Sequence, residues 1–176
     1  MKPKTVGRAS GSSPQPVARQ PGARESSSHG SYSGNGLLAG TRLWTLDGEM
    51  PVEFLGAGDR IITRDRGMAV LRDLRITETT CDTVRIMAGS LGHTRPDEDM
   101  VLPASQRVLV RDWRAEALFG ESQALVPAAR LVDGQFVTRG PRERLRLVQL
   151  TFDAVHILYA DGLEVESAAE VIPAPL

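Results

Sequence analysis

The chain has 176 residues, and its 21 Lys and Arg nearly balance its 22 Asp and Glu, which leaves a formal net charge of −1. A single cysteine, Cys81, excludes an internal disulfide and a cysteine-rich zinc site. Only three histidines occur (His29, His93 and His156), so a multi-ligand metal centre has poor support, and nothing in the sequence points to a cofactor. No run of residues is long and apolar enough to predict a membrane span.

The first 35 residues differ in composition from the rest of the chain. Ser, Gly, Pro and basic residues dominate this leader, and such a segment buries too little apolar area to offset the entropy of ordering it. We therefore predict that residues 1–35 are disordered. Five Lys or Arg against one Glu give the leader a net charge of +4, whereas residues 36–176 carry −5. The cations are dispersed, so we expect no nucleic-acid binding.

The leader also lacks the apolar core of a secretory signal peptide. A cytoplasmic location is therefore the default expectation, and export by a route without such a signal stays open.

Residues 36–172 are predicted to form one all-β domain, and residues 173–176 to fray. Short apolar runs are interrupted by Gly, Pro and Asp about every ten residues, which is typical of a sandwich or a barrel-like fold. Asp47-Gly48 and Asp161-Gly162 predict hairpin turns, because Gly readily adopts a positive φ. In chain order, we expect strands over 41–46, 60–63, 68–76, 83–87, 106–110, 135–138, 145–152, 155–160 and 163–166, an exposed loop over 88–100, and at least one helical turn within 124–131.

The segment that starts at residue 106 weakly repeats the one that starts at residue 41. Each contains a polar residue followed by Arg and an apolar strand, then a short apolar segment and an Asp-Gly or Gly-Asp pair. This similarity favours two related β subdomains, with chance similarity between strand-and-turn sequences as the competing interpretation.

Residues 39–65 read A-G-T-x-x-x-T-x-D-G-x-x-P-V-E-x-L-x-x-G-D-x-I-x-T-R-D. This pattern resembles the opening of the Hint superfamily, the self-cleaving domains of Hedgehog proteins and inteins, and above all the small bacterial Hint domains. The resemblance continues through residues 88–92, 96–110, 124–134 and 150–167. It implies a horseshoe of two pseudo-symmetric β subdomains, and self-cleavage by an N-to-S acyl shift as the chemistry of the family.

The resemblance also implies that the catalytic positions are vacated. Family members start with a Cys nucleophile where this chain has Gly36. Their Ser/Thr-x-x-His motif matches residues 103–106, so Pro103 replaces the hydroxyl and Gln106 replaces the imidazole. The His of their F-D-x-H motif falls on Val155. Three losses in well-matched surroundings indicate a domain that kept its fold and lost self-cleavage.

Three residues remain weak candidates for residual chemistry. His156 lies one position after the family His, and an offset of one residue on a strand turns the side chain to the opposite face unless a bulge resets the register. We therefore expect a structural or surface role for His156. Asp153 belongs to the F-D-x-H segment, and Thr41 is more simply explained as the first residue of a strand.

Three functional interpretations follow, and the first two belong to different classes. The preferred one is a catalytically silent Hint-like domain that acts as a binding or structural module, whose protein partner, if it has one, the sequence does not identify. The alternative is an autoprocessing enzyme that uses Ser33 or Thr41 as nucleophile and His156 as acid or base. An unrelated β domain is the third interpretation.

Overall fold

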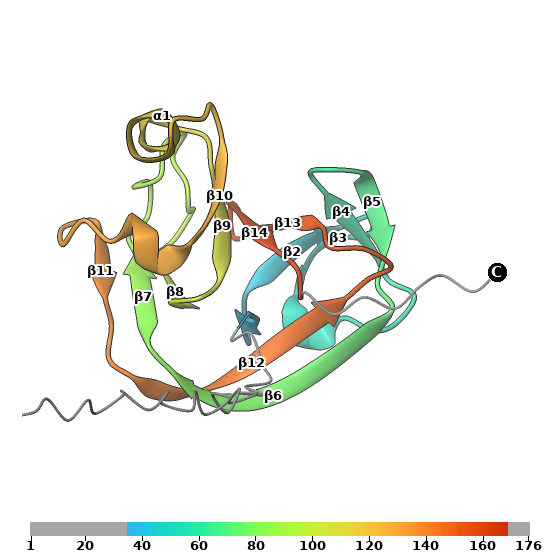
Figure 1. Cartoon of the computed structure of the whole chain (residues 1–176). Helices are drawn as coiled ribbons and strands as arrows, with labels where there is room; N and C mark the ends of the chain where they lie inside the picture. The colour runs from blue at the N-terminus through green and yellow to red at the C-terminus, as the bar shows by residue number, and fades with distance from the viewer. Residues whose placement is uncertain (1–34, 169–176) are drawn as a thin grey trace, which may run out of the picture. The chain divides into compact units, whose positions relative to one another are not determined.

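The computed structural model of the chain describes residues 35–168. The predictions of a disordered leader and of a frayed C-terminus concern residues almost wholly outside this range. Within it, the chain forms fourteen β-strands, two 3-10 helices and a single α-helix (Figure 1). The predicted all-β class is confirmed.

Two strands, β6 and β12, have nine residues each, and the others are short. The fourteen strands are β1 Leu37–Leu38, β2 Arg42–Thr45, β3 Gly48–Pro51, β4 Arg60–Thr63, β5 Gly67–Val70, β6 Asp73–Cys81, β7 Thr83–Ile86, β8 Met100–Pro103, β9 Arg107–Val110, β10 Ala124–Pro127, β11 Val137–Arg139, β12 Glu143–Thr151, β13 Ile157–Ala160 and β14 Leu163–Glu166. The helices are η1 Val52–Phe54, α1 Trp113–Phe119 and η2 Ala128–Leu131.

The strands build three sheets. The largest has eight strands in the order β10-β9-β14-β13-β2-β4-β5, with β3 paired to β2. The long strands β6 and β12 pair antiparallel along their whole length, and β1 adds to the other edge of β12 (Figure 1). The third sheet has the order β11-β7-β8. The apolar faces enclose a core of about two dozen side chains, including Leu43, Leu102, Phe152 and Leu158, so burial of apolar area holds the sheets together.

The two Asp-Gly sites form hairpins of different kinds. Asp161 and Gly162 have φ of 44° and 81°, so both central residues of the β13–β14 turn lie in the left-handed region that a type I′ turn requires. In the β2–β3 hairpin, Leu46 and Asp47 form the turn, and Gly48 follows it with φ of 109°. Gly is needed at position 48 because that backbone conformation is strained for other residues.

The sequence similarity between the two halves corresponds to a repeated local structure. Strands β2 and β9 each pair antiparallel with a strand that ends in Pro, and a 3-10 helix follows that Pro in both halves. The carbonyl of Thr41, just before β2, accepts a 2.8 Å hydrogen bond from the Val52 amide. The carbonyl of Gln106, just before β9, accepts the same bond from Ala128. Thr41 and Gln106 therefore hold corresponding positions in the two halves.

One predicted strand needs correction, and one helix was missed. The strand expected over 68–76 is two strands, because β5 pairs with β4 in the eight-stranded sheet and β6 pairs with β12 in another sheet, and the chain passes between them at Leu71 and Arg72. The helical turn expected within 124–131 is confirmed by η2, which follows strand β10 in that segment. Helix α1 was not predicted, although Asp112 caps its first turn by accepting from the Arg114 amide and Gly120 ends it with φ of 73°.

Candidate functional site

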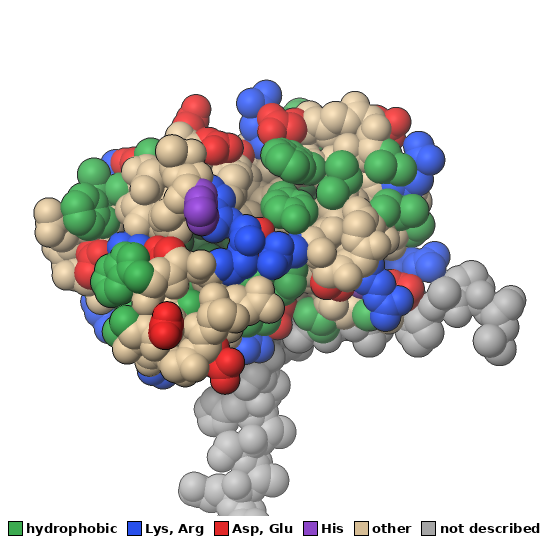
Figure 2. Space-filling view, turned by 90° about the horizontal axis from the view of Figure 1, so that it is seen from above, with side chains coloured by type: hydrophobic (Ala, Val, Ile, Leu, Met, Phe, Trp, Pro, Cys, Tyr) green, Lys and Arg blue, Asp and Glu red, His purple; other side chains and the backbone are tan. Residues whose placement is uncertain are grey.

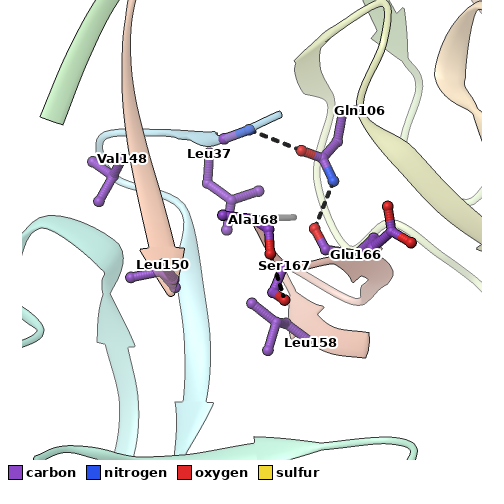
Figure 3. A pocket seen from close by; sticks show the side chains of 9 residues that line it. Leu37, Gln106, Val148, Leu150, Leu158, Glu166, Ser167 and Ala168 are labelled. Atoms are coloured by element: carbon purple, nitrogen blue, oxygen red, sulfur yellow. Dashed lines mark hydrogen bonds between the residues drawn. The ribbon is translucent and has the colours of Figure 1, made fainter. Parts of the chain in front are cut away.

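The backbone amide of Gly36 donates a buried hydrogen bond of 3.0 Å to Oε1 of Gln106 (Figure 3). Nε2 of Gln106 donates to two backbone carbonyls, those of Arg107 at 3.1 Å and Glu166 at 2.9 Å. Because Nε2 faces two acceptors, the amide orientation is fixed by the network, and Oε1 is the atom that faces Gly36. The structure thus brings together two of the positions that the family resemblance singles out.

A tight turn places Gln106 at this point. The backbone N–H of Gln106 donates to the carbonyl of Pro103, the last residue of β8, and β9 begins directly after Gln106, at Arg107. Gln106 is fully buried, and Pro103 is also buried. A buried amide side chain is stable only with its polar atoms paired, and all of Gln106's are.

The peptide bond before Gly36 is held at its other end as well. Nε2 of Gln149, from β12, donates a 2.9 Å hydrogen bond to the carbonyl of Asn35. Two glutamine side chains, Gln149 of β12 and Gln106 of the turn before β9, therefore hold the Asn35–Gly36 peptide group at its oxygen and at its nitrogen. The family resemblance of the sequence expects cleavage at this peptide bond, before the position of the family nucleophile. Gln149 was not identified from the sequence, because no motif distinguishes it.

The backbone of Gly36 leaves no room for a side chain. A Cβ built on Gly36 would lie 2.9 Å from Cβ of Leu147, 3.3 Å from Cγ of Gln149 and 3.3 Å from the carbonyl oxygen of Val148. The first distance is shorter than real Cβ contacts, and Leu147 Cβ is fixed to the backbone of β12. The cavity beside Gly36 has a volume of about 10 Å³, which is about the space of one water molecule.

Val155, where the resemblance expects the His of the F-D-x-H motif, and the ring of the next residue, His156, both lie apart from this cavity. Val155 is 41% exposed and does not line the cavity. His156 is buried at 2% exposure, and its amide donates to Oγ of Ser167, which does line the cavity. The His156 ring, however, does not line this cavity. It packs edge-on against the Phe152 ring, with 5.5 Å between the ring centroids.

His156 forms a second cluster with two carboxylates. Its Nδ1 lies 2.7 Å from Oδ2 of Asp65, and its Nε2 lies 3.4 Å from Oδ1 of Asp153. Asp65 also accepts from the Ile157 amide at 2.9 Å. A small cavity of about 180 Å³ borders this cluster, with walls from β5 and from Arg66 and Arg72. His156 is therefore a buried, paired residue, and not a surface residue.

Both carboxylates are electrostatically stabilised by these contacts. Burial acts to raise the pKa of Asp65, but the hydrogen bonds from the Ile157 amide and the His156 ring outweigh it and hold the pKa below its ordinary value. The hydrogen bond to His156 likewise lowers the pKa of Asp153. The sequence singled out Asp153 but missed Asp65, which lies 91 positions before His156.

The other candidates lie outside both clusters. Thr41 is buried and uses its backbone amide to bond Leu38, and it does not line the Gly36 cavity. Ser33 lies outside the described residues. Cys81 ends β6 as a free thiol whose pKa is raised by burial. Within residues 35–168, no group of three or more His, Cys, Asp or Glu is arranged to hold a metal ion, and no helix is long enough to cross a membrane.

Comparison with known proteins now identifies the family. A family model described as the Hint domain matches residues 35–171, so the chain belongs to this family. A search of the curated proteins finds no match. The resemblance to the Hint superfamily found in the sequence is confirmed by this match.

Several solved structures are similar to this chain. The bacterial intein-like domain from Clostridium thermocellum aligns with a TM-score of 0.50 at 15% identity, over 76% of this chain and 99% of that one. The gp41-1 intein aligns at 0.48 with 9% identity over 76% and 98%, and the MchDnaB-1 intein at 0.48 with 13% identity over 75% and 99%. At such identities the first similarity indicates a shared intein-like fold and nothing about activity.

Proposed function

We propose that this Hint domain does not cleave itself at the Asn35–Gly36 bond and acts as a binding or structural module. One observation carries the proposal: the Gly36 backbone is enclosed so tightly that a nucleophilic side chain has no place there. An N-to-S or N-to-O acyl shift needs a thiol or hydroxyl on the residue after the scissile bond. Gly36 has neither.

The hydrogen bond to Gln106 supports the same conclusion. Cleavage of a peptide bond requires a proton for the departing nitrogen, so a side chain at this point must donate. Gln106 instead accepts a hydrogen bond from the Gly36 amide. Its own N–H groups are directed to the carbonyls of Arg107 and Glu166. Gln106 thus stabilises the intact peptide group.

Gln149 is compatible with either function but cannot act alone. Its N–H bonded to the Asn35 carbonyl resembles a donor that would stabilise an oxyanion. Without a nucleophile and a proton donor, this contact only anchors the chain before β1. The alternative enzyme, with Thr41 as nucleophile and His156 as acid or base, has less support, because neither residue lines the cavity beside Gly36.

The test is the intact mass of the full chain, measured on fresh protein and after incubation with a thiol reductant at neutral pH. We expect one species at 19.1 kDa. A split between residues 33 and 41 that disappears in His156→Ala or Thr41→Ala would overturn the proposal. Asp47→Ala, at an exposed turn, is the control that should leave the mass spectrum unchanged apart from the mass of the substitution.

A further inference from the structure

The outer face of the eight-stranded sheet carries an unusual group of charges around Glu164 of β14. This carboxylate side chain is 1% exposed, and three arginines reach it from different parts of the chain. Arg111 binds it through two nitrogens at 2.8 Å each. Arg64 approaches to 3.6 Å and Arg95 to 3.4 Å. We call Glu164 and these three residues the arginine cluster.

The arginine cluster has more positive charge than its own pairing requires. Two short bonds from Arg111 already satisfy the Glu164 carboxylate, and a bidentate pair of this kind is the strong geometry for Arg. In the described part of the chain, Glu164 is the one carboxylate within 4.0 Å of any of the three guanidinium groups. Three positive charges therefore face one negative charge, which leaves an excess of two.

Two acidic residues close in sequence to the cluster are engaged elsewhere, and the Asp97 carboxylate, beside Gly162, lies more than 4.0 Å from its guanidinium groups. Asp65, next to Arg64 in sequence, bonds His156 and the Ile157 amide. Glu166, two residues after Glu164, pairs with Arg107. The guanidinium groups also keep access to solvent, because the side chains of Arg64 and Arg111 are 29% and 34% exposed, and that of Arg95 is 15% exposed. An external anion can therefore reach the excess charge.

An aromatic platform lies beside the arginine cluster. In the antiparallel register, Glu164 is directly opposite Tyr159 of β13, so both side chains are on the same face of the sheet. The Tyr159 ring stacks on Trp44 of β2 at 5.3 Å between centroids. Trp44 is 45% exposed, and Met68 of β5 is exposed as well. On the face shown in Figure 2, basic side chains gather near the middle with hydrophobic ones beside them.

We propose that this surface binds an acidic peptide segment of a partner protein, with a carboxylate at the arginine cluster and an apolar or aromatic side chain on Trp44 and Tyr159. The inference rests on the binding-module part of the proposed function and names the partner's chemistry. A guanidinium group fits a carboxylate in planar, two-bond geometry, and stacked aromatic side chains are favoured anchors in protein interfaces.

The charge of the whole domain favours a short acidic segment over a nucleic-acid strand. Residues 36–176 carry sixteen Arg and twenty-one Asp or Glu, so their net charge is −5. A long polyanion is repelled by such a domain, because strand binding relies on many basic contacts to phosphates. One or two carboxylates placed at the cluster match its local excess of two positive charges.

The test selects binders from a displayed library of random linear peptides on the immobilised full chain. We expect the selected pool to be enriched in Asp or Glu together with aromatic residues. The same selection on Arg64→Gln/Arg95→Gln is expected to lose this enrichment, and an enriched peptide should bind this variant about tenfold more weakly in an anisotropy titration. Arg111 is kept in the variant because its loss would leave Glu164 buried and unpaired.

Matched controls separate the cluster from general charge. Arg85→Gln/Arg144→Gln removes two exposed arginines that pair with acidic residues outside the cluster. This variant should bind the selected peptide with an affinity within about twofold of that of the unchanged chain. Trp44→Ser should weaken the peptide several-fold, whereas Trp113→Ser, the other and more exposed Trp, should not. Circular dichroism checks that each variant is folded.

Clear outcomes overturn the inference. They are an unenriched pool, a pool that is not acidic, equal binding to Arg64→Gln/Arg95→Gln, and tighter binding of an oligothymidylate probe than of the selected peptide. Each would mean that the arginine cluster is an internal ion network or that it binds a different class of ligand. The intact mass of the same preparation reports on self-cleavage independently, so failure of this inference and failure of the silent-domain proposal give different results.

Discussion

Gly36 and Gln106 are seventy residues apart in sequence and are joined by a buried hydrogen bond from the backbone amide of one to the side-chain oxygen of the other. The bond links the start of the domain to the turn between β8 and β9. Gln106 therefore has a structural role, holding the Gly36 amide, at the position where the family resemblance expects a catalytic imidazole; we call this contact the clamp. Its energetic consequences can be measured.

Gly36→Cys places a thiol at the position where the family resemblance expects the nucleophile. We expect Gly36→Cys to stay uncleaved and to lose about 1–3 kcal/mol of unfolding free energy, because Cβ would overlap Leu147 and force the backbone of β1 or β12 to shift. Intact mass and urea unfolding measure the two effects. Gly56→Cys is the matched control, since its Cβ would meet nothing within 4 Å, and it should be nearly neutral. Efficient cleavage of Gly36→Cys would show that the site retains its chemistry.

Gln106→Ala is expected to destabilise the domain by about 2–4 kcal/mol, because the buried Gly36 amide loses its acceptor and a packed side chain is removed. Urea unfolding measures the loss. The exposed Gln135 makes its hydrogen bond through the backbone, so Gln135→Ala should cost well under that amount. Equal stability of the two variants would contradict the clamp.

Arg111→Met tests the buried ion pair. Its removal leaves Glu164 with only the longer contacts to Arg64 and Arg95, so we expect a loss of about 2–4 kcal/mol. The exposed pair of Arg85 and Asp99 provides the control, because Arg85→Met should cost about 1 kcal/mol or less. If Arg111→Met were neutral, the other two arginines would be sufficient partners for Glu164.

The depressed pKa of Asp65 predicts a pH dependence of stability. A carboxylate whose pKa is lower in the folded state stabilises that state at neutral pH, and the contribution is lost as the pH falls from the ordinary value of 3.8 through the lower folded value. Unfolding free energy measured between about pH 2 and pH 6 should therefore fall less steeply in acid for Asp65→Asn than for the unchanged chain.

The control for that measurement is Asp47→Asn, whose carboxylate is at an exposed turn. It should keep the acid dependence of the unchanged chain. An identical pH profile for Asp65→Asn would mean that the contacts of Asp65 with His156 and Ile157 do not couple to folding.

Local sequence features predicted much of the strand pattern. The ranges of β4 and β14 match the expected strands, since apolar alternation and Asp-Gly or Gly-Asp bends are short-range signals. The expected strand over 68–76 failed because its two halves pair with different strands, β4 and β12, and the local apolar pattern does not encode that change of partner. Helix α1 was missed although its Asp112 cap and terminal Gly120 are sequence signals of the kind used elsewhere.

The sequence by itself determined the fold family, the all-β class and the absence of a side chain at Gly36, because residue identity and motif spacing are properties of the linear chain. Only the tertiary structure decided what surrounds those residues. It placed Gln106 on the Gly36 amide, enclosed Gly36 against Leu147, and left Val155 outside the cavity. It also gathered Arg64, Arg95 and Arg111 around Glu164. Such contacts join residues tens of positions apart, and only the pairing of distant strands brings them within a few ångströms.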